Sequence, residues 1–434
     1  MFRLRSSARL LRELREASRS SGRRREWLSG GAVASAARTT SLLHPLPGLD
    51  VPQCLPDQLG VQPTRVTTLP NGVRVASEDL PGPSACVGVF VDSGSVYETA
   101  ETAGVSHLLE RLSFKDTAHR SHLQIVQDVE ATGGNIGASA SREQTVYSYE
   151  TLKAYLPQAI EVLIDCVRNP LFLQDEVERQ ENFTADRLVV AASGVDHQYL
   201  LDVAEPLLSD WHKGSPVERP ESKYIGGDFR HRADSEMTHV ALAFEVPGGW
   251  LEERDATIMT VVQTLMGGGG SFSSGGPGKG MHSRLYLRVL TKYHTVESFS
   301  VFSNAFDRSG LFGIYLTTPS DFVAKAVDIA TKELIAIATP GQVTDIELAR
   351  AKNSTISAVL MNLESRVIVA EDIGRQILTY GCRKPVDHFL QCMDEMTLDD
   401  ITAFAKKMLS SPPTMASWGD VDKVPPYEFV CKRF

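Results

Sequence analysis

The helix predicted over residues 103–115 carries the residues whose types and spacing come nearest to hydrolytic chemistry. His107, Glu110 and Arg111 stand in the order His-x-x-Glu-Arg. With histidine in place of Arg111, the run would match the inverted zinc-peptidase motif, in which two histidines bind zinc and the glutamate activates a metal-bound water. Arginine keeps its charge and cannot ligate a metal. We therefore predict no metal ligand and no catalytic residue on this helix, which also fits a plain amphipathic helix.

Other catalytic patterns are incomplete as well. His119 and His122 lie three residues apart, but no cysteine or carboxylate cluster completes a metal site beside them. The helix predicted over residues 256–266 contains no histidine, and the chain has no Gly-x-Ser-x-Gly motif for a nucleophilic serine. The sequence thus predicts a chain that catalyses nothing by itself.

Residues 267–280 contain eight glycines in fourteen positions, too many for the interior of a helix or strand. A phosphate-binding P-loop is excluded because Gly278 and Lys279 are followed by Gly280 and not by serine or threonine. A dinucleotide fingerprint is excluded because a helix, not a strand, precedes the glycines. Two interpretations stay open: a flexible flap that contacts a polypeptide, or a long surface loop without a function.

Three acidic residues, Glu364, Glu371 and Asp372, are spaced i, i+7 and i+8. On one helix this spacing places all three on the same face. Such a face could bind arginine side chains, although a solvated helix face has the same pattern. Weaker candidates near a predicted strand end are Asp92, Glu98 and Glu101.

Charge separates the N-terminus from the rest of the chain. The first forty residues hold ten arginines, no lysine and three glutamates, the composition of an organelle transit peptide. Their formal charge is +7. Because the whole chain has a formal net charge of −10, the remaining residues carry −17. An acidic body suits a cationic partner and argues against nucleic acid. The six cysteines form no Cys-x-x-Cys pair, which favours a reducing compartment, and no apolar run is long enough to cross a bilayer.

The order of predicted elements repeats once, which indicates a duplicated α+β unit. Strands are predicted over 65–69, 73–77, 85–93, 135–142 and 144–151 in the first copy, and over 238–246, 295–304 and 311–318 in the second. Helices are predicted over 103–115, 123–131 and 155–168, and over 256–266, 283–290 and 322–337. The predicted domains are a transit peptide (1–42), an extended lead-in (43–64), an N-terminal repeat (65–208), a linker (209–227) and a C-terminal repeat (228–434).

The first repeat is shorter than the second by roughly 50 residues, about two helices at ordinary lengths. The repeat register places the junction near Gln180 and Glu181. Because such helices would cover a sheet face, we expect exposed apolar surface. A natural short unit and a splice or gene-model deletion both fit this pattern.

From about residue 64 onward, the chain resembles the alpha subunits of mitochondrial processing peptidases, in the pitrilysin-like metallopeptidase family, and the plant forms in particular. The resemblance rests on the following residues: the run 107–111, Gly133 to Asn135, Ala138 to Gln144, the loop 266–286, Met361 to Arg366 and Glu371 to Gln376. It implies two homologous α/β-sandwich-like repeats, of which the first is shortened here. Family members have two long helices after the position of Gln180, so folding of the first half and the dimer contact are the properties most affected.

The resemblance also implies a heterodimer with a zinc-bearing beta subunit, which holds the intact motif and cleaves arginine-rich presequences of imported precursors. No cofactor is then expected in this chain, whose location would be the mitochondrial matrix or the matrix side of the inner membrane. The implied substrate-binding residues are Gly267, Gly268, Gly269, Gly270, Ser271, Phe272, Gly275, Gly276, Gly278, Lys279, Gly280, Glu364, Glu371 and Asp372.

Two other functions remain open at this stage. The family's fold also occurs in structural core subunits of respiratory complex III, and in plants the peptidase is built into that complex, so both roles are compatible. An autonomous zinc peptidase is the remaining alternative, against which Arg111 argues.

Overall fold

A computed structural model describes residues 63–171, 184–214, 222–270 and 282–434. The predicted transit peptide, all but the last two residues of the predicted lead-in, the proposed junction at residue 180 and most of the glycine-rich loop therefore lie outside the described residues. No helix in the described ranges is both long and apolar enough to cross a membrane.

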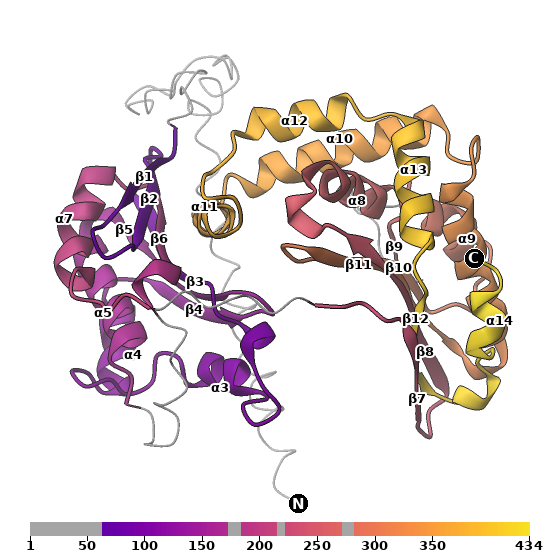
Figure 1. Ribbon diagram of the computed structural model, residues 1–434, viewed down its shortest axis with the longest axis horizontal. Helices are drawn as coiled ribbons and strands as arrows, with labels where there is room; N and C mark the ends of the chain where they lie inside the picture. Colours follow the sequence, from indigo (N-terminus) through magenta and orange to yellow (C-terminus); the bar gives the residue numbers. More distant parts are fainter. Residues whose placement is uncertain (1–62, 172–183, 215–221, 271–281) are drawn as a thin grey trace, which may run out of the picture. The chain divides into compact units, whose positions relative to one another are not determined.

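Two six-stranded mixed sheets, with helices attached to each, organise the described residues (Figure 1). The first sheet has the order β1-β2-β6-β3-β5-β4. Its strands are β1 (Arg65–Thr68), β2 (Arg74–Glu78), β3 (Ser84–Val91), β4 (Asn135–Ala140), β5 (Thr145–Leu152) and β6 (Leu188–Ser193). Only β2 and β6 pair in parallel within it. The predicted α+β class and its two repeated units are confirmed.

The second sheet has the order β7-β12-β8-β11-β10-β9, and its one parallel pair is β7 with β12. Its strands are β7 (Gly227–Arg232), β8 (Met237–Pro247), β9 (Gly268–Gly270), β10 (Ser298–Ala305), β11 (Ser309–Pro319) and β12 (Thr414–Gly419). The run β7-β12-β8-β11-β10 matches β2-β6-β3-β5-β4 in order and in strand direction. The duplication seen in the sequence is thus a duplication of sheet topology.

The first half contributes helices α3 (Val105–Leu112), α4 (His122–Ala131), α5 (Leu156–Arg168) and α7 (His197–Leu208). The second half contributes α8 (Glu253–Met266), α9 (Val323–Ala338), α10 (Asp345–Asn362), α11 (Arg366–Tyr380), α12 (Val386–Asp394), α13 (Leu398–Leu409) and α14 (Tyr427–Cys431). A π-helical turn over Tyr286–Leu290 stands in the segment predicted as helix 283–290. Helix α7 was not predicted; Asp196 begins it by accepting a hydrogen bond from the Tyr199 N–H.

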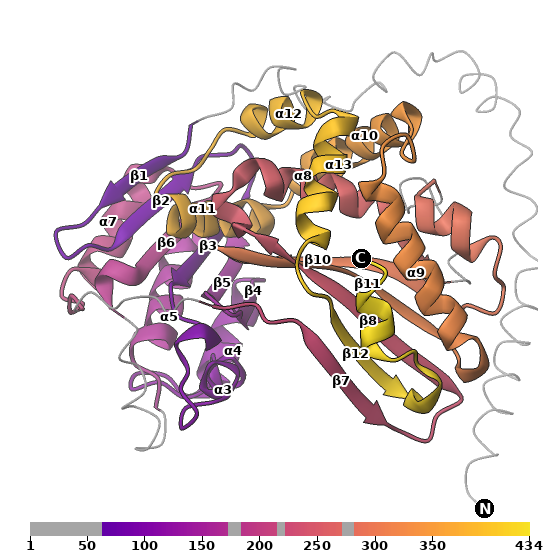
Figure 2. The same ribbon diagram turned by 45° about the vertical axis from the view of Figure 1, so that its right-hand side comes forward.

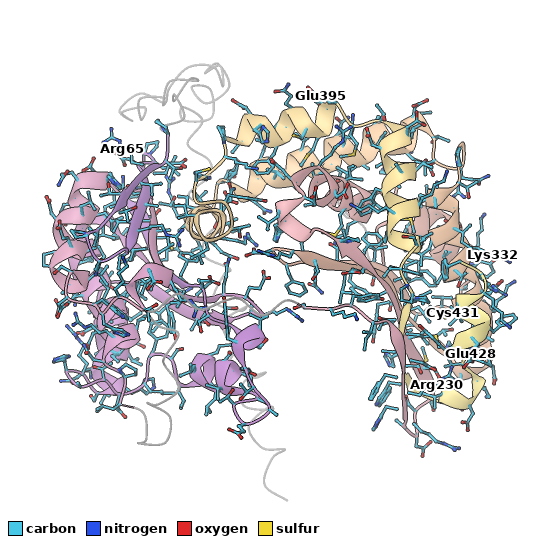
Figure 3. The ribbon with its side chains drawn as sticks, viewed as in Figure 1. Arg65, Arg230, Lys332, Glu395, Glu428 and Cys431 are labelled. Atoms are coloured by element: carbon cyan, nitrogen blue, oxygen red, sulfur yellow. The ribbon has the colours of Figure 1, made fainter. Side chains whose placement is uncertain are left out.

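Each sheet turns an apolar inner face toward its own helices. In the second half, alternate residues Val240, Leu242, Phe244 and Val246 of β8 enter a core shared with α8, α9 and α13. In the first half the corresponding core joins β3, β5 and β6 to α5 and α7. Figure 2 shows α9 and α13 beside the second sheet. Arg230 of β7 donates to the carbonyls of Val421, Val424 and Pro425 and so holds the segment before α14 (Figure 3).

Helix α11 belongs to the second half by sequence but packs on the first sheet. Val369, Ile373 and Ile377 form one stripe, i, i+4 and i+8, against the outer face of β2, β3 and β6. At Gly374 a Cβ atom would lie 2.3 Å from the Phe90 ring, so only glycine lets the helix lie this close. Figure 1 shows α11 beside β6. The outer face of the first sheet is therefore covered by α11, and no described helix of the first half lies on it.

Candidate functional site

The incomplete zinc motif lies on the short helix α3, next to edge strand β4. The His107 side chain is 66% exposed, and its Nδ1 lies 3.9 Å from Glu110 Oε2. The same Glu110 oxygen accepts a hydrogen bond from the Ala140 N–H of β4 at 3.2 Å. Arg111 is exposed. Glu110 thus holds the edge strand in this chain, and Arg111 occupies the place of a metal ligand without being able to act as one.

His119 and His122 do not converge on a site. His119 Nδ1 lies 2.7 Å from Asp165 Oδ1, whereas His122 Nδ1 lies 2.8 Å from the Phe114 carbonyl. Asp165 is buried, but hydrogen bonds from Asn169, His119, Thr117 and Arg120 outweigh the effect of burial and lower the pKa of its carboxyl group. This cluster ties the loop before α4 to helix α5.

The acidic residues near the end of β3 have separate local partners. Glu98 accepts the backbone N–H groups of Gly104 and Ser106, each at 2.8 Å, at the start of α3. Burial opposes ionisation of Glu98, yet these hydrogen bonds lower its pKa. Asp92 lies 3.5 Å from the Tyr97 hydroxyl, and Glu101 is exposed. Glu98 is therefore a helix-capping residue in this fold.

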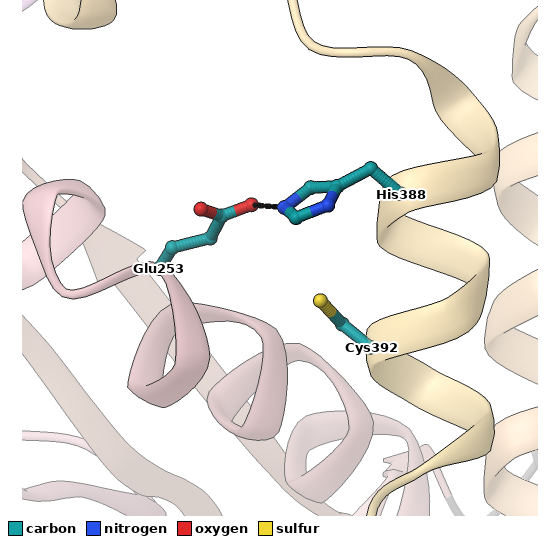
Figure 4. Close-up of side chains that lie close together, drawn as sticks. All are labelled: Glu253, His388 and Cys392. Atoms are coloured by element: carbon teal, nitrogen blue, oxygen red, sulfur yellow. Dashed lines mark hydrogen bonds and ion pairs between the residues drawn. The ribbon is translucent and has the colours of Figure 1, made fainter.

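One set of side chains in the described ranges has the composition of a metal site, and the sequence analysis did not find it. Donor atoms of Glu253, His388 and Cys392 lie within 4.8 Å of one another (Figure 4). His388 and Cys392 are one turn apart on α12, whereas Glu253 begins α8. The spacing His-x-x-x-Cys was the available signal; its distance in sequence from Glu253 concealed the third donor.

Both carboxylate oxygens of Glu253 already have protein partners. Oε1 lies 2.5 Å from His388 Nε2, and Oε2 pairs with the Lys384 ammonium. Burial opposes ionisation, but Lys384 and His388 lower the pKa of Glu253. A cation at this point would have to compete with the fixed ammonium group of Lys384. The arrangement therefore fits an ion-pair network joining α8 to α12 better than a metal centre.

The glycine-rich run begins as a strand, which corrects the prediction that it contains none. Gly268, Gly269 and Gly270 form β9 and pair with Ser300, Phe299 and Ser298 of β10. A Cβ atom on Gly268, whose φ is +106°, would lie 2.0 Å from the Phe299 carbonyl oxygen. Close backbone approach and positive φ thus explain why glycine stands at this edge. Residues 271–281, including Ser271, Phe272, Gly275, Gly276, Gly278, Lys279 and Gly280, lie outside the described residues.

The three acidic residues predicted on one helix face are not on one face. Glu364 precedes α11, because Ser365 caps that helix by accepting the Ile368 N–H. Asp372 accepts hydrogen bonds from Gln376 Nε2 and from Arg383 Nε, the latter at 3.2 Å, and burial raises its pKa. The N-cap Ser365 begins α11 one residue after Glu364, so Glu364 lies outside the helix, which the spacing argument overlooked.

Glu371 lines an open recess beside the first sheet. Its side chain is 49% exposed and lies 4.0 Å from Arg375. Together they form one wall of a recess of about 300 Å³ against strands β4 and β5. The other lining residues are Gly137, Ala138, Ser139, Ser141, Gln144, Val146 and Ser148. The recess thus combines an exposed carboxylate with small and polar strand residues beside a sheet edge.

Comparisons with known proteins show the family of the chain. A family model described as Insulinase (Peptidase family M16) matches residues 74–221, and one described as Peptidase M16 inactive domain matches residues 179–355. The chain belongs to the M16 peptidase family. The fold class and the resemblance drawn from the sequence are thereby confirmed.

Relatives in this M16 family share most of their length with the chain. The alpha subunit of mitochondrial-processing peptidase from Solanum tuberosum is 48% identical over 96% of this chain and 94% of its own length. A probable alpha-1 subunit from Arabidopsis thaliana is 48% identical over 94% and 91%, respectively. The human alpha subunit is 32% identical over 94% and 91%. The resemblance to plant alpha subunits is confirmed.

The same comparison measures the shortened repeat. The potato alignment spans 474 positions, whereas 96% of this 434-residue chain is about 417 residues, so about 57 positions of the M16 relative have no counterpart here. In the chain itself, 19 residues separate α5 from β6, but 75 separate α9 from β12. The two differences agree, which fits an absence of helices corresponding to part of α10–α13 from the first half.

Proposed function

We propose that this chain is a non-catalytic, alpha-type subunit of a mitochondrial processing peptidase and binds arginine-rich presequences for a zinc-bearing beta subunit to cleave. The observation that carries the proposal is Arg111 in the place of the second zinc ligand, in a chain 48% identical to plant alpha subunits. An M16 helix with one histidine cannot hold catalytic zinc with that motif. The relatives' names support a mitochondrial location and a partner subunit.

Two features of the fold suit binding of an extended cationic peptide. Strand β4 is an edge strand, which can add a peptide strand through backbone hydrogen bonds. The recess beside it carries the Glu371 carboxylate, a partner for a guanidinium group. The glycine-rich segment 267–280 continues from edge strand β9, and we propose that it contacts the same peptide.

Co-expression with a plant beta subunit tests the proposal. We expect a heterodimer that cleaves a presequence peptide, whereas the chain purified alone neither cleaves it nor holds stoichiometric zinc. Deleting residues 271–280 should reduce cleavage without abolishing dimer formation. The matched control deletes residues 215–221 in the predicted linker. About one tightly held zinc per isolated chain, or full activity after the loop deletion, would contradict the assignment. Co-purifying cytochrome subunits would add the complex III role.

A further inference from the structure

The outer faces of the two sheets differ in what covers them. That of the first sheet is sealed by the α11 stripe of Val369, Ile373 and Ile377. That of the second sheet carries four aromatic side chains, Phe229, His239, Tyr315 and Trp418, on four neighbouring strands. Phe229 is 66%, Trp418 41% and Tyr315 39% exposed. Contiguous exposed aromatic residues mark surfaces that bind another molecule.

A shallow hollow runs over these aromatic residues. Its volume is about 580 Å³, and every residue lining it comes from strands β7, β8, β11 or β12. The lining residues are Phe229, His231, His239, Ala241, Tyr315, Ala416, Ser417 and Trp418. No helix of the described ranges contributes to the lining. We call this surface the open face.

Internal contacts hold the open face in one arrangement. His239 Nδ1 lies 2.7 Å from the Tyr315 hydroxyl and 3.2 Å from Thr317 Oγ1. The His239 ring meets Trp418 edge to face, with centroids 5.3 Å apart. His239 Nδ1 and the Tyr315 hydroxyl are thus paired with each other. A partner binding here would find an ordered surface and lose little free energy to ordering it.

The duplicated topology indicates what kind of element fits the open face. The strands of the open face correspond to β2, β6, β3 and β5, on which α11 lies in the first sheet. The first half has no described counterpart of α11. Its stretch between α5 and β6 is 19 residues long, whereas the matching stretch between α9 and β12, which contains α10 and α11, is 75 residues long. A helix is therefore the element that this topology places on such a face.

We infer that the open face binds an amphipathic helix supplied by another polypeptide chain. The helix carries apolar residues at i, i+4 and i+8, as α11 does, and a small residue where it crosses the aromatic rings, as Gly374 crosses Phe90. The physical driving force is burial of the Phe229, Tyr315 and Trp418 surface. This inference does not depend on the proposed peptidase role.

Binding of a helical probe to the full chain tests the inference. The probe is a fluorescent synthetic peptide of residues 364–382, which contains α11 with its flanking residues. We expect saturable binding measured by fluorescence anisotropy. A matched peptide with Val369→Asp and Ile373→Asp should bind at least about tenfold more weakly, because each apolar side chain contributes more than about 1.4 kcal/mol when buried.

Variants of the chain locate the binding surface. Phe229→Ser and Trp418→Ser should each weaken probe binding about tenfold, whereas Leu123→Ser, at a 65% exposed position of α4, should leave it unchanged. Circular dichroism confirms that each variant is folded; Phe229 lies on edge strand β7 and is mostly exposed, so its replacement removes little packing. The inference would be overturned if the parent chain showed no saturable binding, or if both open-face variants bound the probe as tightly as the parent chain does. A homodimer that Trp418→Ser dissociates and that excludes the probe would also overturn it, because a second copy would then be the occupant.

Discussion

At the scale of single residues, one substitution removes metal chemistry from α3, and small environmental differences separate neighbouring carboxylates. Arg111 replaces a ligand, and Glu110 is left as a hydrogen-bond acceptor for the edge strand. Glu371 and Asp372 are adjacent in sequence, yet Glu371 faces the recess beside β4 and Asp372 faces Arg383. Adjacent positions on a helix point about 100° apart, so one can bind a ligand while the other stabilises the fold.

This division predicts different effects for two isosteric substitutions. In the reconstituted dimer, Glu371→Gln should raise KM for an arginine-bearing presequence about twofold to fivefold at low salt with kcat unchanged, because an exposed ion pair contributes up to about 1 kcal/mol. High salt should remove the difference. Asp372→Asn should instead lower the denaturation midpoint, since it weakens the contact with Arg383. Glu428→Gln on α14 is the charge-matched control; a KM change as large in that variant would count against a local contact.

His197 predicts a pH dependence of stability. Its Nδ1 lies 2.8 Å from Ser77 Oγ and its Nε2 2.8 Å from Thr67 Oγ1, which joins α7 to β1 and β2. Burial, with the nearby charge of Arg65, lowers its pKa below the ordinary value of 6.5. The unfolded chain then binds more protons, so stability should fall as pH drops below about 6.5 toward the folded-state pKa.

Urea denaturation followed between about pH 7.5 and 5.5 measures this effect around the ordinary histidine pKa. At the higher pH, His197→Gln should be less stable than the parent chain, because one ring nitrogen contact is lost. Its denaturation midpoint should, however, change less with pH than that of the parent chain. An unchanged slope in the variant would assign the pH dependence to other groups.

At the scale of elements, the outer face of the first sheet depends on a helix from the other half of the chain. The α11 backbone lies directly on Phe90 at Gly374, and Arg74 Nη1 donates to the Ile377 carbonyl at 2.8 Å. Arg383, just after α11, pairs with Glu78 of β2 and with Asp372. Apolar packing and buried ion pairs therefore fasten the same helix, and burial lowers the pKa of Arg383 only to about 10, so it stays charged at neutral pH.

Gly374→Val tests this attachment. Its branched side chain would overlap the Phe90 ring and force α11 outward, which should destabilise the chain by about 1–3 kcal/mol. Gly137→Ala on β4, where φ is not positive and a Cβ would lie 3.4 Å from Ser148 Oγ, controls for loss of a glycine. Thermal or urea denaturation of both variants provides the comparison. Equal midpoints for Gly374→Val and the parent chain would show that the contact with Phe90 does not constrain the helix.

At the scale of the whole molecule, the two halves share a topology but not their helices. We expected exposed apolar surface where helices are missing from the first repeat; in the described residues, exposed aromatic side chains gather on the outer face of the second sheet. Helix α11 packs on the outer face of the first sheet, whereas the outer face of the second sheet is the open face. In the described residues, the outer face that a helix does cover is thus covered by a helix distant in sequence.

Restoring the missing length should close the open face. We expect a chimera that carries the corresponding potato segment between Gln180 and Glu181 to melt about 5 °C or more above the parent chain. Trp418 fluorescence should shift to shorter wavelength as its 41% exposed ring is covered. An inserted glycine–serine segment of equal length is the control. A chimera with unchanged Trp418 emission would mean that the segment does not lie on this face.

The sequence by itself determined the absence of a complete zinc motif, the duplicated order of strands and helices, and the length of the shortfall. These properties depend on residue types and local periodicity. Only the tertiary structure decided that α11 covers the first sheet, that Glu364, Glu371 and Asp372 have separate surroundings, and that three glycines form β9. Each of these depends on contacts between distant segments, as between Gly374 and Phe90 or Gly268 and Phe299, and local patterns carry no information about such pairs.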